Sequence, residues 1–252
     1  MFYLVGLGLK PAHLTAEALE AVKRCRHVFL ESYTSRYAEG DKAGLEKLLG
    51  REVLELGRRE VEEGFGKILA RSKREHTALL IHGNPLIATT HAQLLLDARA
   101  AGAECRVIPG LSVLDFLAKS GLDAYKFGRV TTIVFPRENY APESFYDAIE
   151  KNKSLGLHTL CLLDIRAEEG RLMTAKEAIK ILLDIEKKRG KNLVAKSKLV
   201  GLCCMGGEQE LIVAGRPERL LDFALDGLPQ SLVVCGELNE KEIEAMKTLC
   251  ES

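Results

Sequence analysis

Short apolar runs alternate with amphipathic stretches along the first 110 residues of the chain. The runs have the length of strands, and the stretches between them repeat their apolar positions at helical spacing. This pattern predicts strands at 2–9, 27–31, 52–56, 77–81 and 105–108, and helices at 15–24, 60–71 and 89–101. Such alternation is typical of a mainly parallel sheet with helices on both of its faces.

The order of predicted strands and helices changes after Pro109 and Gly110, which end the last of these strands. The pattern then predicts strands at 131–135, 158–163, 199–205, 210–214 and 231–235, and helices at 112–119, 143–151, 174–188, from 216 onward and at 240–250. Only four residues separate the strands at 199–205 and 210–214, which favours an antiparallel hairpin and a mixed sheet. We therefore expect two α/β domains, an N-terminal one at 1–110 and a C-terminal one at 111–252.

Composition limits the classes of partner. The 252 residues include 36 Lys and Arg against 36 Asp and Glu, so no overall field attracts nucleic acid or an anionic membrane. No apolar run approaches the roughly 20 residues that span a bilayer, and the first residues carry no basic signal region. We expect a soluble cytoplasmic protein with no membrane partner and no direct nucleic-acid binding.

Cysteine spacing bears on metal chemistry. The chain has seven cysteines, an odd number, and most fall within apolar, strand-like runs without a CxxC pair. Buried, reduced thiols fit this distribution better than a metal site, and they fit a reducing compartment. We expect no metal.

The segment 81–93 is the strongest candidate for a ligand site. Its predicted strand runs into Gly83-Asn84-Pro85 and then a helix, and a helix that begins at the end of a strand suits a small polar ligand. Thr89 or Thr90 is the predicted helix cap. An ordinary strand-to-helix turn would show the same pattern.

A second glycine turn follows the first strand. Gly6 and Gly8 form a GxG but lack the third glycine of a dinucleotide-binding fingerprint, so a Rossmann cofactor site is not supported. We expect these glycines to allow close approach of a ligand or of a neighbouring backbone.

Five short segments stand in a fixed order along the chain: VGLGL at 5–9, YTS at 33–35, ATTHA at 88–92, YKFG at 125–128 and GLHTL at 156–160, with DI at 164–165 and MTA at 173–175 after them. Together they resemble the diphthine synthase family of the tetrapyrrole methylase superfamily. The resemblance extends over nearly the whole chain.

The resemblance implies a fold and a reaction. It implies two α/β domains of tetrapyrrole methylase type with an S-adenosylmethionine cleft between them, in a homodimer. The implied reaction is methyl transfer from S-adenosylmethionine to the amino group of a modified histidine on translation elongation factor 2, in diphthamide biosynthesis. The family has two product types, a trimethylated amine in archaea and an additional carboxylate ester in eukaryotes, and the sequence does not settle between them.

The resemblance also implies cofactor-binding positions. These are mostly apolar positions or backbone groups, which suit the adenine and thioether of the cofactor. They are Leu9, Asn84, Ile87, Ser112, Val113, Leu163, Met205, Gly206 and Gln230.

This chain departs from the family pattern at several of these positions. The family usually has Asp at the position of Asn84 and His at the position of Gln230. The segment Cys203-Cys204-Met205-Gly206 also replaces a more common family segment that contains Ala-Arg. These differences keep a catalytically silent paralogue that binds elongation factor 2 as one alternative. A methyltransferase acting on a tetrapyrrole or corrinoid precursor is the other.

No side chain stands out as the general base, and the catalytic residues stay unknown from the sequence. We expect His91 to be a hydrogen-bonded structural histidine and His158 to be structural at the start of a strand. Residues 33–35 are equally compatible with a substrate contact and with a capping turn.

Overall fold

The computed structural model describes residues 1–138 and 140–251. Two compact units divide the chain, unit 1 at Met1–Leu114 and unit 2 at Asp115–Ser252. The predicted domain boundary at residue 110 falls four residues before the end of unit 1.

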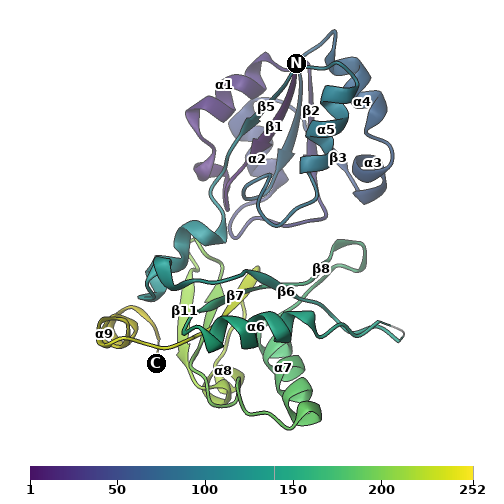
Figure 1. Cartoon of the computed structure of the whole chain (residues 1–252). Helices are drawn as coiled ribbons and strands as arrows, with labels where there is room; N and C mark the ends of the chain where they lie inside the picture. The colour runs from purple at the N-terminus through teal and green to yellow at the C-terminus, as the bar shows by residue number, and fades with distance from the viewer. Residues whose placement is uncertain (139, 252) are drawn as a thin grey trace. The chain divides into compact units, whose positions relative to one another are not determined.

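Unit 1 contains a five-stranded sheet (Figure 1). Its strands are β1 (Phe2–Gly6), β2 (His27–Glu31), β3 (Leu54–Leu56), β4 (Thr77–Ile81) and β5 (Cys105–Ile108), in the order β3-β2-β4-β1-β5. Every neighbouring pair is parallel, with Leu4 opposite both Leu79 and Val107. The prediction of a parallel sheet is therefore confirmed.

Helices cover both faces of this sheet, as predicted. The helices are α1 (Ala16–Arg24), α2 (Lys42–Leu49), α3 (Arg58–Glu62), α4 (Gly66–Ser72) and α5 (Ala92–Ala100), with a 3-10 turn η1 at Pro11–His13. Val5 packs with Val22 and Leu45 on one face. Leu79 packs with Val61 and Leu94 on the other, which encloses the central strands between two apolar cores.

Three helix predictions in the first 120 residues were wrong in detail. The helix expected at 60–71 is interrupted around Gly64, where Phe65 turns inward onto Phe2 at a ring distance of 5.4 Å. The helix expected at 89–101 begins only at Ala92, because the Thr89 hydroxyl instead donates to the Pro85 carbonyl at 2.8 Å. The helix expected at 112–119 is a 3-10 helix, η2 (Val113–Ser120).

Unit 2 contains a mixed five-stranded sheet, also as predicted. Its strands are β6 (Thr131–Ile133), β7 (Thr159–Leu163), β10 (Leu199–Cys203), β11 (Leu211–Gly215) and β12 (Gln230–Val234), in the order β11-β10-β12-β7-β6. β10 and β11 form the expected antiparallel hairpin, whereas β6 and β7 are parallel. The remaining helices are η3 (Ala124–Lys126), α6 (Ser144–Ser154), η4 (Ala167–Glu169), α7 (Ala175–Arg189), α8 (Pro217–Asp222) and α9 (Glu240–Leu249).

A small hairpin in unit 2 was not predicted. Its strands, β8 (Ile165–Arg166) and β9 (Arg171–Leu172), are two residues long, which is too short for a hydrophobic pattern to reveal. The cysteine prediction fares better, because all seven thiols are free and only Cys105 is exposed. No helix among residues 1–138 and 140–251 is long and apolar enough to cross a membrane.

A buried polar network joins α9 to the start of β7. Glu242 accepts hydrogen bonds from Lys126 Nζ at 2.6 Å and from the backbone N–H of Asp123 at 3.0 Å, and it pairs with His158 Nε2 at 2.8 Å. The other ring nitrogen of His158 accepts from the N–H of Gly236 at 3.0 Å. His158 is therefore structural, as expected from the sequence.

Candidate active site

The order of strands in unit 1 creates a topological switch point. The chain leaves β1 through α1 toward β2, and it leaves β4 through α5 toward β5. Since β2 lies beyond β4 and β5 lies beyond β1, the two connections run in opposite directions across the sheet, and α1 and α5 pack on its opposite faces. In open α/β sheets such a divergence at the carboxyl ends of the strands is where ligands bind.

Glycines bring the backbone into close contact at this switch point. Gly8 and Gly83 exchange backbone hydrogen bonds of 3.2 and 2.8 Å, and both have positive φ, +72° and +75°. A Cβ on Gly6 would lie 2.3 Å from the amide nitrogen of Gly110. Only glycine permits this approach, so the GxG turn serves a backbone contact between the loops after β1, β4 and β5.

The turn after β4 exposes apolar side chains. The Asn84 Oδ1 accepts from the Leu86 N–H at 3.1 Å, which makes a local Asx turn. Leu86 and Ile87 are then exposed by 43% and 37% of their surface, and Ala88 has a positive φ of 55°. Strained backbone beside exposed apolar groups is typical of a binding loop.

The loops after β1 and β5 supply the remaining unit 1 positions. Leu9 and Ser112 are buried, at 8% and 6% exposure, whereas Leu111 is 39% exposed. The Leu9 N–H donates to His13 Nδ1 at 3.3 Å. The predicted cofactor positions of unit 1 therefore all follow β1, β4 or β5 at the carboxyl edge of one sheet.

The predicted positions of unit 2 follow β7 and β10 or begin β12. Leu163 ends β7, Met205 and Gly206 follow β10, and Gln230 starts β12. Leu163, Met205 and Gln230 are buried at 7%, 4% and 7% exposure. The Gly206 N–H donates to Glu210 Oε2 at 2.7 Å.

The Gln230 side chain has a structural role in unit 2. Its Oε1 accepts from the Ala175 N–H at 2.7 Å, and its Nε2 donates to the Leu225 and Gly227 carbonyls at 2.9 and 2.6 Å. The amide thus joins the start of α7 to the loop before β12. Both Nε2 donors and one acceptor position of Oε1 are therefore engaged within unit 2.

Sequence reasoning missed Glu31 and misjudged His91. Glu31 is fully buried at the end of β2, and its carboxylate accepts from the backbone N–H groups of Tyr33 and Thr34 at 2.5 and 2.7 Å. His91 is 1% exposed, yet neither ring nitrogen has a hydrogen-bond partner in the part of the chain that the structure describes. Glu31 Oε2 lies 3.9 Å from His91 Nε2, which is too far for a hydrogen bond. The expectation of a hydrogen-bonded His91 is therefore wrong.

A signal for Glu31 existed in the sequence, because it is an acidic residue at the end of an otherwise apolar strand. Such a residue is rarely buried without several donors to compensate its charge. The sequence did not show which donors these were, since a polar residue at a strand end is also common on a surface.

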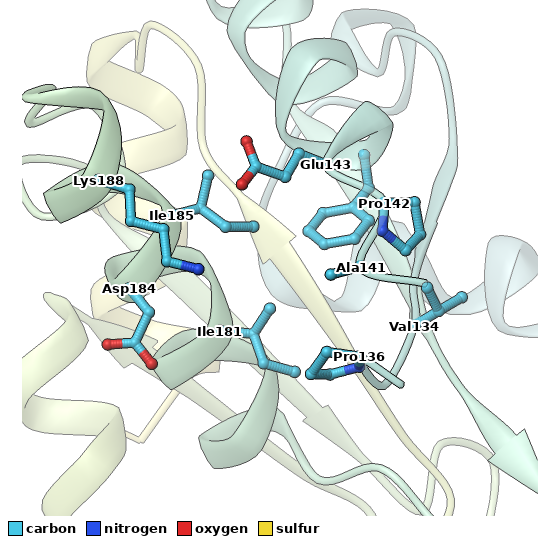
Figure 2. Close-up of a pocket in the computed structure, with 10 residues that line it drawn as sticks. Val134, Pro136, Ala141, Pro142, Glu143, Ile181, Asp184, Ile185 and Lys188 are labelled. Carbon is cyan, nitrogen blue, oxygen red and sulfur yellow. The ribbon is translucent and has the colours of Figure 1, made fainter. Parts of the chain in front are cut away.

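A separate cavity of about 110 Å³ lies in unit 2 (Figure 2). It opens between α7 and the segment from β6 to α6, where Ile181 faces Pro136. Its lining is Val134, Pro136, Ala141, Pro142, Glu143, Phe145, Ile181, Asp184, Ile185 and Lys188. None of the predicted cofactor positions lines this cavity, so we do not include it in the candidate site.

The donors at the unit 1 switch point suit S-adenosylmethionine better than a metal. Tight glycine backbone, exposed Leu86 and Ile87 and the half-buried Asn84 amide offer shape, apolar contact and neutral polar groups. Within residues 1–138 and 140–251, no three His, Cys, Asp or Glu side chains gather in a possible metal-binding group.

Comparison with known proteins gives this geometry a family. Residues 1–199 match the model for the tetrapyrrole (corrin/porphyrin) methylases. The diphthine synthase of Methanococcus aeolicus is 36% identical over 254 residues, which cover 100% of this chain and 99% of the relative. The chain belongs to the diphthine synthase family of these methylases.

Other diphthine synthase family members extend the similarity. The diphthine methyl ester synthase of Schizosaccharomyces pombe is 36% identical, covering 98% of this chain and 93% of its own. A crystal structure of a diphthine synthase superimposes with a TM-score of 0.88 at 27% identity, over 99% of this chain and 95% of the other. As a member of this family, the chain is a methyltransferase with the two α/β domains that the sequence predicted.

Proposed function

We propose that this enzyme transfers methyl groups from S-adenosylmethionine to the amino group of a modified histidine on translation elongation factor 2, in diphthamide biosynthesis. The observation that carries the proposal is the switch point between β1 and β4, where the loops that hold Leu9, Asn84 and Ser112 converge. Full-length similarity to diphthine synthases supports the choice of substrate over a tetrapyrrole or corrinoid precursor.

The proposed chemistry asks more for position than for side-chain reactivity. When bound, S-adenosylmethionine supplies a methyl group on a sulfonium, which is already an activated leaving group. The protein then has to hold an uncharged amine in line with that methyl, and positioning of this kind contributes about 7 to 11 kcal/mol to lowering the barrier. The close backbone packing at Gly8, Gly83 and Gly110 supports such positioning.

Mass spectrometry of elongation factor 2 tests the substrate. In cells that lack this gene, we expect the histidine to carry only the aminocarboxypropyl group, and we expect purified enzyme with S-adenosylmethionine to add the missing methyl groups. A fully modified histidine in the deletion strain would refute the proposal. The same spectra count the methyl groups and detect an ester, because relatives of both product types are 36% identical to this chain.

Hydrogen exchange tests the cofactor site. S-adenosylmethionine should slow exchange together at Leu9, at residues 84–87 and at residues 112–113, the three loops of the switch point. Slower exchange at Leu163, Met205, Gly206 and Gln230 as well would add the predicted positions of unit 2. No change at the three loops would remove them from the site.

We also propose that the enzyme is a cytoplasmic homodimer, as the family resemblance implies. Sedimentation equilibrium should then give twice the chain mass of 27.8 kDa. A single-chain mass at micromolar concentration would contradict the dimer.

A further inference from the structure

Glu31 links the end of β2 to the turn at residues 33–35. Its Oε1 accepts from the N–H groups of Tyr33 and Thr34, and its Oε2 accepts from the Thr34 hydroxyl. Three donors offset the cost of burying one carboxylate, which is why a charged group is tolerated here. Thr34 is half-buried, whereas Glu31 and His91 are buried, so Thr34 is the residue of the three that is nearest to solvent.

His91 lies beside the same carboxylate, and the Pro85 carbonyl is also close enough to raise its pKa. Its Nε2 is 3.9 Å from Glu31 Oε2, and the edge of the Tyr33 ring packs against the imidazole at a centroid distance of 6.4 Å. A buried polar group without a hydrogen-bond partner lowers stability, which argues for a use that compensates the cost. A shift of about 1 Å brings the pair into hydrogen-bond distance.

The place of these residues matches the candidate site. β2 is the direct neighbour of β4 in the parallel sheet, so Glu31 ends at the same edge as Gly83 and the turn after it. His91 closes that turn at the start of α5. The sequence segments YTS (33–35) and ATTHA (88–92) thus each place one residue, Thr34 and His91, beside the Glu31 carboxylate. Cofactor binding alone explains neither segment.

We propose that Thr34, Glu31 and His91 form a proton relay that accepts the proton which the substrate amine must lose before it is methylated. This inference rests on the proposed function. An amine is largely protonated at neutral pH, and only a nitrogen with a free electron pair can attack the methyl group. Transfer to a primary or secondary amine leaves a proton on the positively charged nitrogen, which must be lost before the next transfer, whereas a third transfer leaves a quaternary nitrogen with no proton.

The transfer balances without a further reactant. The N–H bond of the substrate ammonium breaks, and its electron pair stays on nitrogen. The proton binds Thr34 Oγ1 while the hydroxyl's own proton passes to Glu31 Oε2 and then to His91 Nε2. The resulting imidazolium is stabilised by the Glu31 carboxylate. After the product leaves, the proton returns by the same path to solvent.

The electrostatic surroundings leave His91 ready to accept. Burial lowers the pKa of His91. Glu31, the Pro85 carbonyl and Glu62 raise it by less, so the pKa stays below its ordinary value of 6.5 and the ring is uncharged at neutral pH. The other charged or titratable groups beside the pair are Tyr33, whose pKa is raised by burial and by Glu31, and Arg58, 5.0 Å above the Tyr33 ring. The acceptor is lost only as pH falls below the lowered His91 pKa.

Residue 34 permits a near-isosteric test. Thr34→Val removes the hydroxyl and keeps the shape, whereas Thr34→Ser keeps the hydroxyl. Methylation of purified elongation factor 2 intermediate at pH 7 should fall about 100-fold in the Val variant and less than threefold in the Ser variant, the range expected when one proton acceptor is lost. Calorimetric binding of S-adenosylmethionine should be equal in both.

The pH profile separates a relay from a structural role. In His91→Gln we expect a similar loss at pH 7 that shrinks steadily toward pH 10, because the amine there loses its proton to solvent unaided. His76→Gln, which removes an exposed histidine at the start of β4, is the control and should keep the wild-type profile.

Two results would overturn the relay. One is equal activity of Thr34→Val and Thr34→Ser. The other is a His91→Gln loss that is constant across pH and accompanied by a lower melting temperature, which would make the pair structural. If the wild-type enzyme methylates no elongation factor 2 at all, the proposed function fails instead.

Discussion

The two units differ in how their buried polar groups are used. In unit 1, Gly8 and Gly83 hold two loops together through the backbone, and the buried His91 lacks a hydrogen-bond partner among the described residues. In unit 2, Gln230 and Glu242 are buried and each makes several hydrogen bonds.

The contrast indicates where chemistry and where stability are located. A site that must bind and react keeps unused polar groups and strained backbone, at a cost in stability. Buried groups that are paired, as Gln230 and Glu242 are, add rigidity but offer fewer groups to a ligand. The five predictions below test this distinction, from the largest expected effect to the smallest.

Gly110→Ala should weaken cofactor binding and slow methylation about 100-fold. The new Cβ would lie 2.4 Å from the Gly83 carbonyl oxygen and 2.8 Å from the Gly8 nitrogen, so the loops must separate. A displacement of about 1 Å in a positioning element costs roughly 100-fold in rate. Gly66→Ala, where a Cβ meets no atom within 4 Å, is the matched control. Normal S-adenosylmethionine affinity in Gly110→Ala, measured by calorimetry, would show that the backbone contact is dispensable.

Glu242→Gln should destabilise unit 2 by about 3 kcal/mol, the cost of breaking a buried charged network. Exposed Glu244 on the same helix provides the control, and Glu244→Gln should change the free energy of unfolding by less than about 0.5 kcal/mol. Denaturant unfolding with a probe in unit 2 measures both. Similar stability in the two variants would mean that the Glu242 contacts add nothing.

The same residue sets an acid limit on stability. Burial raises the pKa of Glu242, but hydrogen bonds from Lys126, from the Asn239 and Asp123 N–H groups and from His158 outweigh it and hold the pKa at about 2. Because this pKa lies below the ordinary 4.5, the stabilisation is complete above pH 4.5 and is lost as pH falls toward 2. In Glu242→Gln this part of the pH dependence should disappear.

Gln230→Leu should lower the free energy of unfolding by about 2 kcal/mol, because the Ala175 N–H and the two carbonyls lose their partner. We expect S-adenosylmethionine affinity to change less than about twofold, since the amide is engaged within unit 2. Gln209→Leu, at an exposed glutamine, serves as the control. An unchanged melting temperature with weaker binding would assign the side chain to the cofactor.

Asn84→Asp is the smallest and most specific change. Both residues can accept the Leu86 N–H at 3.1 Å, so the turn should persist. A carboxylate facing the positive methionine end of the cofactor would gain about 1 kcal/mol, or roughly fivefold to tenfold in affinity, with less gain at high salt. Equal or weaker binding in calorimetric titration would make residue 84 purely structural, so that its departure from the family pattern says nothing about activity.

Much of the fold could be read from local patterns. β2 (His27–Glu31), β4 (Thr77–Ile81) and β5 (Cys105–Ile108) lie where the apolar runs predicted them, and Thr15 and Thr174 cap their helices. These features depend on residues close in sequence, such as a side chain and the backbone three positions later. The late start of α5 could not be read, because the Thr89 hydroxyl has a competing partner in Pro85.

The candidate site divides in the same way. The sequence by itself determined that one glycine turn ends the apolar run at residues 2–9 and that another follows the strand at 77–81. The family resemblance placed Leu9, Asn84 and Ile87 at those turns. Only the tertiary structure decided that Gly8 bonds to Gly83 and that Glu31 lies between Thr34 and His91. Contacts of this kind depend on the order of strands in the sheet, which long-range packing sets and no local pattern records.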